Sequence, residues 1–92
     1  MHDSLFTAAL APLAPAAGAA RLGLAISKKA APLAVTRNGI KRQARESFRH
    51  QRAKLPPLDI VLFARGPCAH ARPAALRASL DRLWQRIADR SK

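Results

Sequence analysis

The sequence has few acidic and few aromatic residues. Five Asp and Glu stand against 17 Lys and Arg among 92 residues, which gives a formal net charge of +12. Aromatic side chains make up 4% of the chain, and tyrosine is absent. Positive charge of this strength on a small domain attracts polyanions, and counterion release adds a salt-dependent contribution to nucleic-acid binding. We therefore expect a polyanionic partner, with nucleic acid as the first candidate and a membrane surface as the rival.

Cysteine and long apolar runs are also lacking. Cys68 is the single cysteine, so no internal disulfide can form, and a zinc site would depend on three scattered histidines. No apolar run approaches the roughly 20 residues that cross a bilayer, and the start of the chain lacks the pattern of a secretory signal. A chain of this length supports one small core. We expect a single cytoplasmic domain over residues 1–92, with no metal site of its own and no membrane contact.

Three stretches predict β-strands. Residues 5–11 are apolar and give the weakest signal, whereas Leu22, Leu24 and Ile26 alternate with small residues at the period of a strand with one buried face. Residues 58–64 form a nearly continuous apolar run, which is typical of a central strand. Residues 12–20 are rich in Ala, Pro and Gly and predict a long hairpin connection between the first two strands.

Two amphipathic helices are expected. Thr36 is placed to cap the first helix, which runs to about Lys54 before a Pro-Pro pair. At 100° per residue its apolar side groups within a third of the circumference and packs inward; this side consists of Ile40, Ala44, Ser47, Phe48, Gln51 and Leu55. Pro73 suits the first turn of the last helix, and its apolar residues Leu76, Leu80, Leu83, Trp84 and Ile87 repeat at helical spacing.

The few aromatic residues are assigned to the core. Trp84 lies on the apolar side of the last helix, so we expect it to be buried and not to stack on bases. Phe6 and Phe63 are assigned to the core in the same way, and stacking on bases in a cleft is the alternative.

The first helix carries a basic face beside its apolar side. Five cations fall in one neighbouring arc, with Arg37 at its boundary: Lys41, Arg42, Arg45, Arg49 and Arg52. A solvated face of internal salt bridges is the ordinary alternative, but it needs acidic neighbours one turn away. Glu46 is the only one, and we expect it to pair with the cations around it. Guanidinium groups match phosphate oxygens in two-pronged contacts, so the basic face favours RNA binding.

The basic face belongs to a longer pattern. It comprises Arg21-Leu22-Gly23 to Ser27-Lys28-Lys29, then Ala34-Val35-Thr36-Arg37-Asn38, Lys41-Arg42, Arg45-Glu46-Ser47-Phe48-Arg49, and Asp59-Ile60-Val61 to Arg65. From residue 21 to residue 66 this pattern resembles bacterial ribonuclease P protein, and its motifs are highly specific. The last helix matches only in position and amphipathic character.

The resemblance implies an α+β fold. It is a two-layer α/β sandwich of ribosomal-protein type, with a small mixed sheet and the basic helix in a left-handed βαβ crossover. The implied function is that of the protein subunit of ribonuclease P, which helps a catalytic RNA to remove the 5′ leader from precursor tRNA. The implied partners are that RNA and precursor tRNA, with no small-molecule substrate. Hydrolysis would belong to the RNA and its Mg²⁺.

The acidic residues agree that the protein is not the catalyst. A protein that cleaves RNA by itself with magnesium gathers several carboxylates around the ion. Here they lie on five separate stretches: Asp3, Glu46, Asp59, Asp81 and Asp89. We therefore expect no catalytic residue and no cofactor bound by the protein alone. A ribosomal or general RNA-binding protein without a catalytic RNA partner is the alternative.

The RNA-binding residues are carried over by position. The resemblance implies RNA contact by Lys28, Lys29, Arg37, Asn38, Lys41, Arg42 and Arg45. Arg49 joins them because it lies on the same side of the helix.

Two departures from the family pattern have consequences. Gly39 takes the third place of an Arg-Asn-Arg signature, which removes one cation and predicts weaker RNA binding. The family's N-terminal helix, which flanks the cleft for the tRNA leader, is missing ahead of the first strand. We expect either reduced leader binding or an incorrectly assigned start of the chain.

Overall fold

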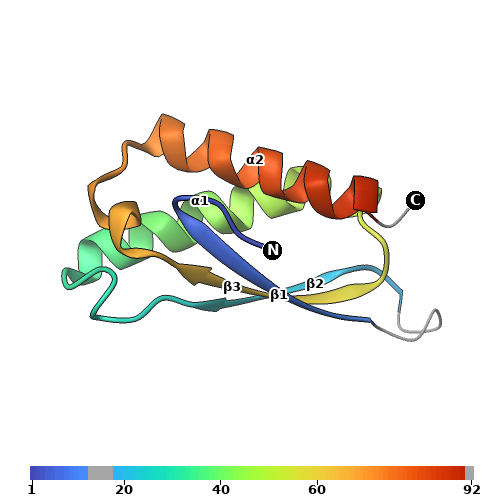
Figure 1. Cartoon of the computed structure of the whole chain (residues 1–92), viewed down its shortest axis with the longest axis horizontal. Coiled ribbons are helices and arrows are strands. Elements are labelled where there is room, and N and C mark those ends of the chain that lie inside the picture. Colours follow the sequence, from blue (N-terminus) through green and yellow to red (C-terminus); the bar gives the residue numbers. More distant parts are fainter. Residues whose placement is uncertain (13–17, 91–92) are drawn as a thin grey trace.

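The protein is built from three strands and two long helices. The computed structural model describes residues 1–12 and 18–90. The elements follow the chain in the order β1 (Phe6–Pro12), β2 (Arg21–Ala25), α1 (Ala34–Gln51), η2 (Arg52–Lys54), β3 (Leu58–Ala64), η3 (Gly66–His70) and α2 (Pro73–Arg90), where η2 and η3 are short 3₁₀ helices. The strands form one sheet, and both long helices lie over the same face of it (Figure 1). This is the two-layer α+β arrangement that the family resemblance implies.

β3 lies in the middle of the sheet, in the order β1-β3-β2. It pairs antiparallel with β1 and parallel with β2, so α1 makes the connection between two parallel strands. The prediction of a hairpin between the first two strands is wrong, because β3 separates them. An apolar strand such as β3 is most stable where both of its edges are paired and one face is covered. Residues 13–17 of the predicted hairpin connection lie outside the described residues.

α1 begins three residues earlier than a Thr36 cap would place it. Its N-terminal boundary is Leu33, whose backbone is extended and which makes no side-chain cap hydrogen bond, so the prediction of a Thr36 cap is wrong. The Nη1 atom of Arg37 instead donates hydrogen bonds to the carbonyl oxygens of Ala31 and Pro32, at 2.8 and 3.0 Å. The α-helix ends at Gln51, and η2 extends the helical path to Lys54. The loop before α1 is therefore held by a side chain from the first turns of the helix.

The core lies between the helices and the sheet. α1 contributes Ile40, Ala44, Ser47 and Phe48 to it, as the helical periodicity predicts, and Gln51 is half-buried. α2 contributes its predicted apolar side, including Trp84, which is 1% exposed. The rings of Phe48 and Trp84 meet edge to face, with centroids 5.5 Å apart. None of the helices in the described residues is long and apolar enough to span a bilayer.

The two faces of β3 differ in exposure. Ile60 and Leu62 are fully buried beneath the helices, whereas Val61 and Phe63 are 37% and 41% exposed. Because successive side chains of a strand point to opposite faces, Val61 and Phe63 lie on the face that the helices leave uncovered. The assignment of Phe6 to the core is confirmed, and that of Phe63 is wrong.

A buried polar network joins the two helices. The hydroxyl of Ser47, fully buried on α1, accepts a hydrogen bond of 2.8 Å from Nε1 of Trp84 and donates one to a carboxylate oxygen of Asp81. At the sheet, partial burial raises the pKa of Asp3, but hydrogen bonds from Ser79 and from the backbone N–H groups of Phe6 and Leu5 outweigh it, so this pKa lies below its ordinary value. Each buried hydroxyl is thus paired with a carboxylate.

The Ser47→Ala variant tests this network. It leaves the buried indole N–H of Trp84 without its acceptor, and an unsatisfied buried donor costs about 1–3 kcal/mol. We expect the free energy of unfolding, measured by urea denaturation, to fall by that amount. Ser4→Ala at an exposed position is the control and should change stability by less than about 0.5 kcal/mol. Equal stabilities of the two variants would show that the network contributes nothing.

Candidate nucleic-acid interface

The basic face of α1 lies in solvent because the adjoining apolar side of the helix is buried. Arg42, Arg45, Arg49 and Arg52 are exposed, and Lys41 is half-buried. Side chains three and four positions apart lie on the same side of a helix, so these cations form one continuous surface. The exposed arc that the sequence predicts is therefore present on the folded protein.

The remaining predicted RNA-binding residues lie around the N-terminal end of α1. Lys28 and Lys29 are exposed in a turn after β2, and Asn38 is exposed on the helix. Arg37 is half-buried, and one of its nitrogens is occupied by the two carbonyl bonds to the preceding loop. Arg37 therefore has a structural role in addition to the predicted contact with RNA.

The carboxylates of the described residues pair away from the basic face. Asp59 binds Arg21 through two hydrogen bonds, the shorter at 3.0 Å. Glu46 pairs with Arg77 of α2 at 3.6 Å, so the prediction that it pairs with the surrounding cations of its own helix is wrong. Arg77 also lies 3.7 Å from Asp81. The cationic partner of Glu46 thus comes from α2.

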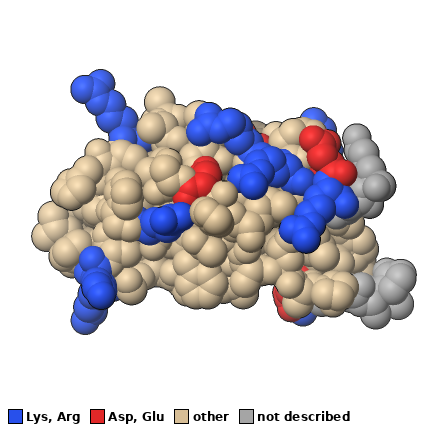
Figure 2. Space-filling view, in the orientation of Figure 1, with Lys and Arg blue, Asp and Glu red and all other residues tan. Residues whose placement is uncertain are grey.

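The cations of the basic face consequently lack acidic partners. Among residues 1–12 and 18–90, no carboxylate oxygen lies within 4.0 Å of the charged nitrogens of Lys41, Arg42, Arg45 or Arg49. On the face of the molecule drawn in Figure 2, which has α2 and β1 in front, Lys and Arg outnumber Asp and Glu, and acidic side chains lie next to some of the cations. Unpaired surface cations of this kind are free to contact phosphate groups.

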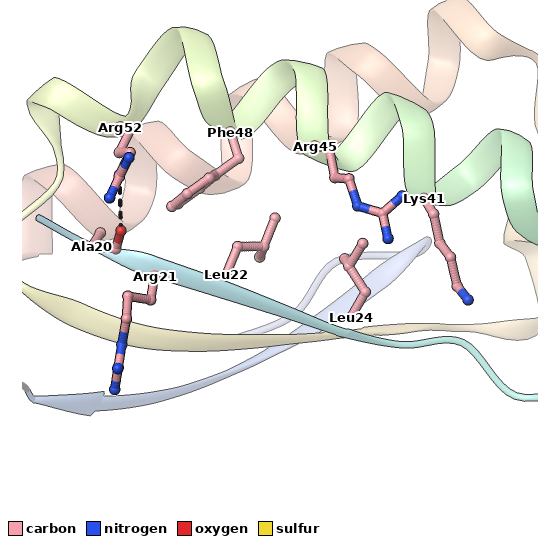
Figure 3. A pocket seen from close by; sticks show the side chains of 8 residues that line it. All are labelled: Ala20, Arg21, Leu22, Leu24, Lys41, Arg45, Phe48 and Arg52. Carbon is pink, nitrogen blue, oxygen red and sulfur yellow. Dashed lines mark hydrogen bonds between the residues drawn. The ribbon is translucent and has the colours of Figure 1, made fainter.

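A groove runs between α1 and β2 and has a volume of about 460 Å³. Lys41, Arg45 and Arg52 reach into it from the helical side, and Leu22 and Leu24 of β2 point toward them (Figure 3). Nε of Arg52 donates a hydrogen bond of 3.1 Å to the carbonyl oxygen of Ala20, which positions this side chain at one end of the groove. Ala20, Arg21 and Phe48 complete the lining.

Arg52 is the residue that sequence reasoning left out of the predicted RNA-binding residues. It falls in the same arc as Lys41 and Arg45, so the helical rotation already contained the signal.

Neither a reactive thiol nor a cluster of metal ligands is found among the described residues. Burial, with a smaller contribution from the negative charge of Asp3, raises the pKa of the Cys68 thiol to about 12, so the thiol stays protonated and unreactive at neutral pH. No three His, Cys, Asp or Glu side chains in the part of the chain described here come close enough together to hold a metal ion. What this surface offers chemically is positive charge and hydrogen-bond donors.

The chain is thus a small two-layer α+β domain whose crossover helix exposes a basic face that no carboxylate of the described residues pairs. The family model described as Ribonuclease P matches residues 2–88. The chain therefore belongs to the ribonuclease P protein family.

Individual relatives agree with this assignment. The ribonuclease P protein component of Idiomarina loihiensis is 47% identical over 79% of this chain and 58% of its own length. That of Bordetella avium is 45% identical over 95% of this chain and 76% of its own. A structure of Staphylococcus aureus RNase P protein matches the whole chain and 79% of its own, with a TM-score of 0.80 and 27% identity. The chain spans 56–58% of the length of three curated relatives that it matches.

Gly39 gives a test of the local structure of the basic helix. It lies inside α1, and a Cβ added there meets nothing within 4 Å. Because glycine is about 1 kcal/mol less favourable than alanine inside a helix, we expect Gly39→Ala to raise the free energy of unfolding by about that amount in urea titrations.

Gly18→Ala is the contrasting control. Gly18 has a φ of +88°, a conformation that side chains with a Cβ rarely adopt, so the same substitution should lower stability there. A loss of stability in Gly39→Ala would contradict the packing described for this position.

Proposed function

We propose that this protein is the protein subunit of ribonuclease P, which binds the catalytic RNA and assists removal of the 5′ leader from precursor tRNA. Membership of the family supports this function. The observation that carries it is the basic face of α1, which is exposed and lacks carboxylate partners within the described residues. A cytoplasmic location follows from the proposed partners.

The proposed interaction is electrostatic docking of α1 on the RNA backbone. The planar guanidinium groups of Arg42, Arg45 and Arg49 suit two-pronged contacts with phosphate oxygens, and Lys41 adds a point charge. Contacts of this kind fix the orientation of a protein on RNA without reading its sequence. The same surface is extended by Lys28 and Lys29 in the turn before α1 and by Arg37 and Asn38 in its first turns. The protein would thereby hold the folded RNA and offset phosphate repulsion when precursor tRNA binds.

Magnesium belongs to the RNA in this proposal. Mg²⁺ prefers oxygen ligands, usually carboxylates and phosphates. Asp59 and Glu46 are engaged by arginines on separate elements, and Asp3 binds Ser79. Their placement does not suit a shared ion, whereas RNA phosphates do. The protein's residues therefore bind and position RNA, and the RNA with its Mg²⁺ performs hydrolysis.

A cleavage assay tests the function directly. The protein is added to precursor tRNA at low Mg²⁺ concentration, with and without a bacterial ribonuclease P RNA subunit, and leader removal is followed on gels. We expect cleavage to be stimulated only when that RNA is present, because the protein supplies binding and no catalytic group. Weak binding to all RNAs without stimulation would instead support a general RNA-binding protein.

The salt dependence of binding tests the surface. Each lost phosphate contact lowers the slope of log affinity against log salt concentration by about one. We expect Arg45→Ala to show this reduction for ribonuclease P RNA, measured by filter binding at several salt concentrations. Arg90→Ala on α2 is the control and should keep the wild-type slope. The opposite result, an unchanged slope for Arg45→Ala and a flatter one for Arg90→Ala, would move the interface to another face.

A further inference from the structure

The groove between α1 and β2 combines positive charge with an apolar floor. Lys41, Arg45 and Arg52 are spaced four and seven residues apart. They therefore lie on one side of the helical path, over a length of roughly 16 Å. Opposite them, Leu22 and Leu24 stay half-buried, and Phe48 closes the floor at 8% exposure. In Figure 3 the leucines point up from β2 toward the cations of α1. A ligand in this groove meets both kinds of side chain at once.

Apolar side chains on the floor of the groove would not strengthen binding if the groove contacted phosphates alone. In a paired RNA helix the bases are stacked inside, and the backbone presents phosphates and ribose hydroxyls to a protein. Apolar side chains contribute to RNA binding when an unpaired base can be laid against them. The groove also lies at an edge of the sheet, because β2 is an edge strand. An extended RNA chain can therefore pass along it. Its volume of about 460 Å³ falls within the usual range for small-ligand sites.

We propose that this groove binds an unpaired nucleotide segment of single-stranded RNA. The phosphates lie against Lys41, Arg45 and Arg52, and a base or ribose lies on Leu22 and Leu24. Arg52 sets one end of the segment, because its bond to the Ala20 carbonyl holds the guanidinium at that position. This inference rests on the proposed RNA-binding function and adds to it the class of RNA that the groove takes.

The test compares two RNA probes with equal numbers of phosphates. One is an unstructured single-stranded RNA, and the other is a fully paired hairpin. Fluorescence anisotropy gives the affinity of each for the full chain. Leu24→Ala removes part of the floor and keeps all charges, and Leu10→Ala is its matched control, since Leu10 is also half-buried against the core and does not line the groove. Melting temperatures confirm that both variants are folded.

The expected result is selective. Leu24→Ala should lower the affinity for the single-stranded probe by about five-fold, which corresponds to roughly 1 kcal/mol. It should lower the affinity for the hairpin by less than two-fold. Leu10→Ala should leave both affinities near wild type. Equal loss for both probes in Leu24→Ala, or no loss for either, would overturn the proposal.

The Arg45→Ala variant distinguishes failure of the proposal for the groove from failure of the proposed RNA-binding function. If Arg45→Ala weakens binding while Leu24→Ala does not, the basic face binds RNA and the groove floor does not. If neither variant changes binding of either probe, RNA binding by this side of the protein is refuted as well. Should Leu24→Ala fail to fold, a single-stranded probe carrying 4-thiouridine is crosslinked to the wild-type protein. Crosslinks within residues 20–24 or 41–52 support the proposal, and crosslinks confined to other segments overturn it.

Discussion

Burial of one side of α1 is the constraint on which the rest of the structure depends. Ile40, Ala44 and Phe48 pack against the sheet and α2, and the rigid rotation of the helix then holds Arg42 and Arg45 in solvent. The core and the proposed RNA surface are therefore two sides of one element. A small domain that presents its charges on a packed helix can keep them in a fixed arrangement without devoting a separate structure to binding.

The scarcity of acidic residues completes this arrangement. A helix with many cations is usually balanced by carboxylates one turn away, which would compete with RNA phosphates. Here Glu46 is drawn to Arg77 on the neighbouring helix, and Asp59 is held by Arg21 across two parallel strands. The side chains of these pairs are 31–63% exposed, and ion pairs near the surface contribute little to stability. Their consequence is that the cations of the basic face remain available to an external polyanion.

The sequence predictions were correct where a local pattern decides the structure, and wrong where contacts between distant segments decide it. β3 and the start of α2 were predicted at their observed residues, because a continuous apolar run and a proline at a helix start are local signals. The hairpin between β1 and β2 was wrong, since pairing depends on where β3 inserts. The Thr36 cap was wrong because α1 already begins at Ala34, which puts Thr36 inside its first turn. Phe63 was misplaced because apolar character alone does not say which face of a sheet is covered.

The sequence by itself determined the charge of the protein, the helical rotation that separates cations from core residues, and the motifs that place the chain in its family. All of these depend on composition or on spacing within one element. Only the tertiary structure decided that Glu46 meets Arg77 and that Arg52 reaches Ala20. It likewise joined Leu22 and Leu24 to Lys41 and Arg45 around one groove. Such contacts join segments far apart in the chain, and they form only when the helices and the sheet pack around their common core.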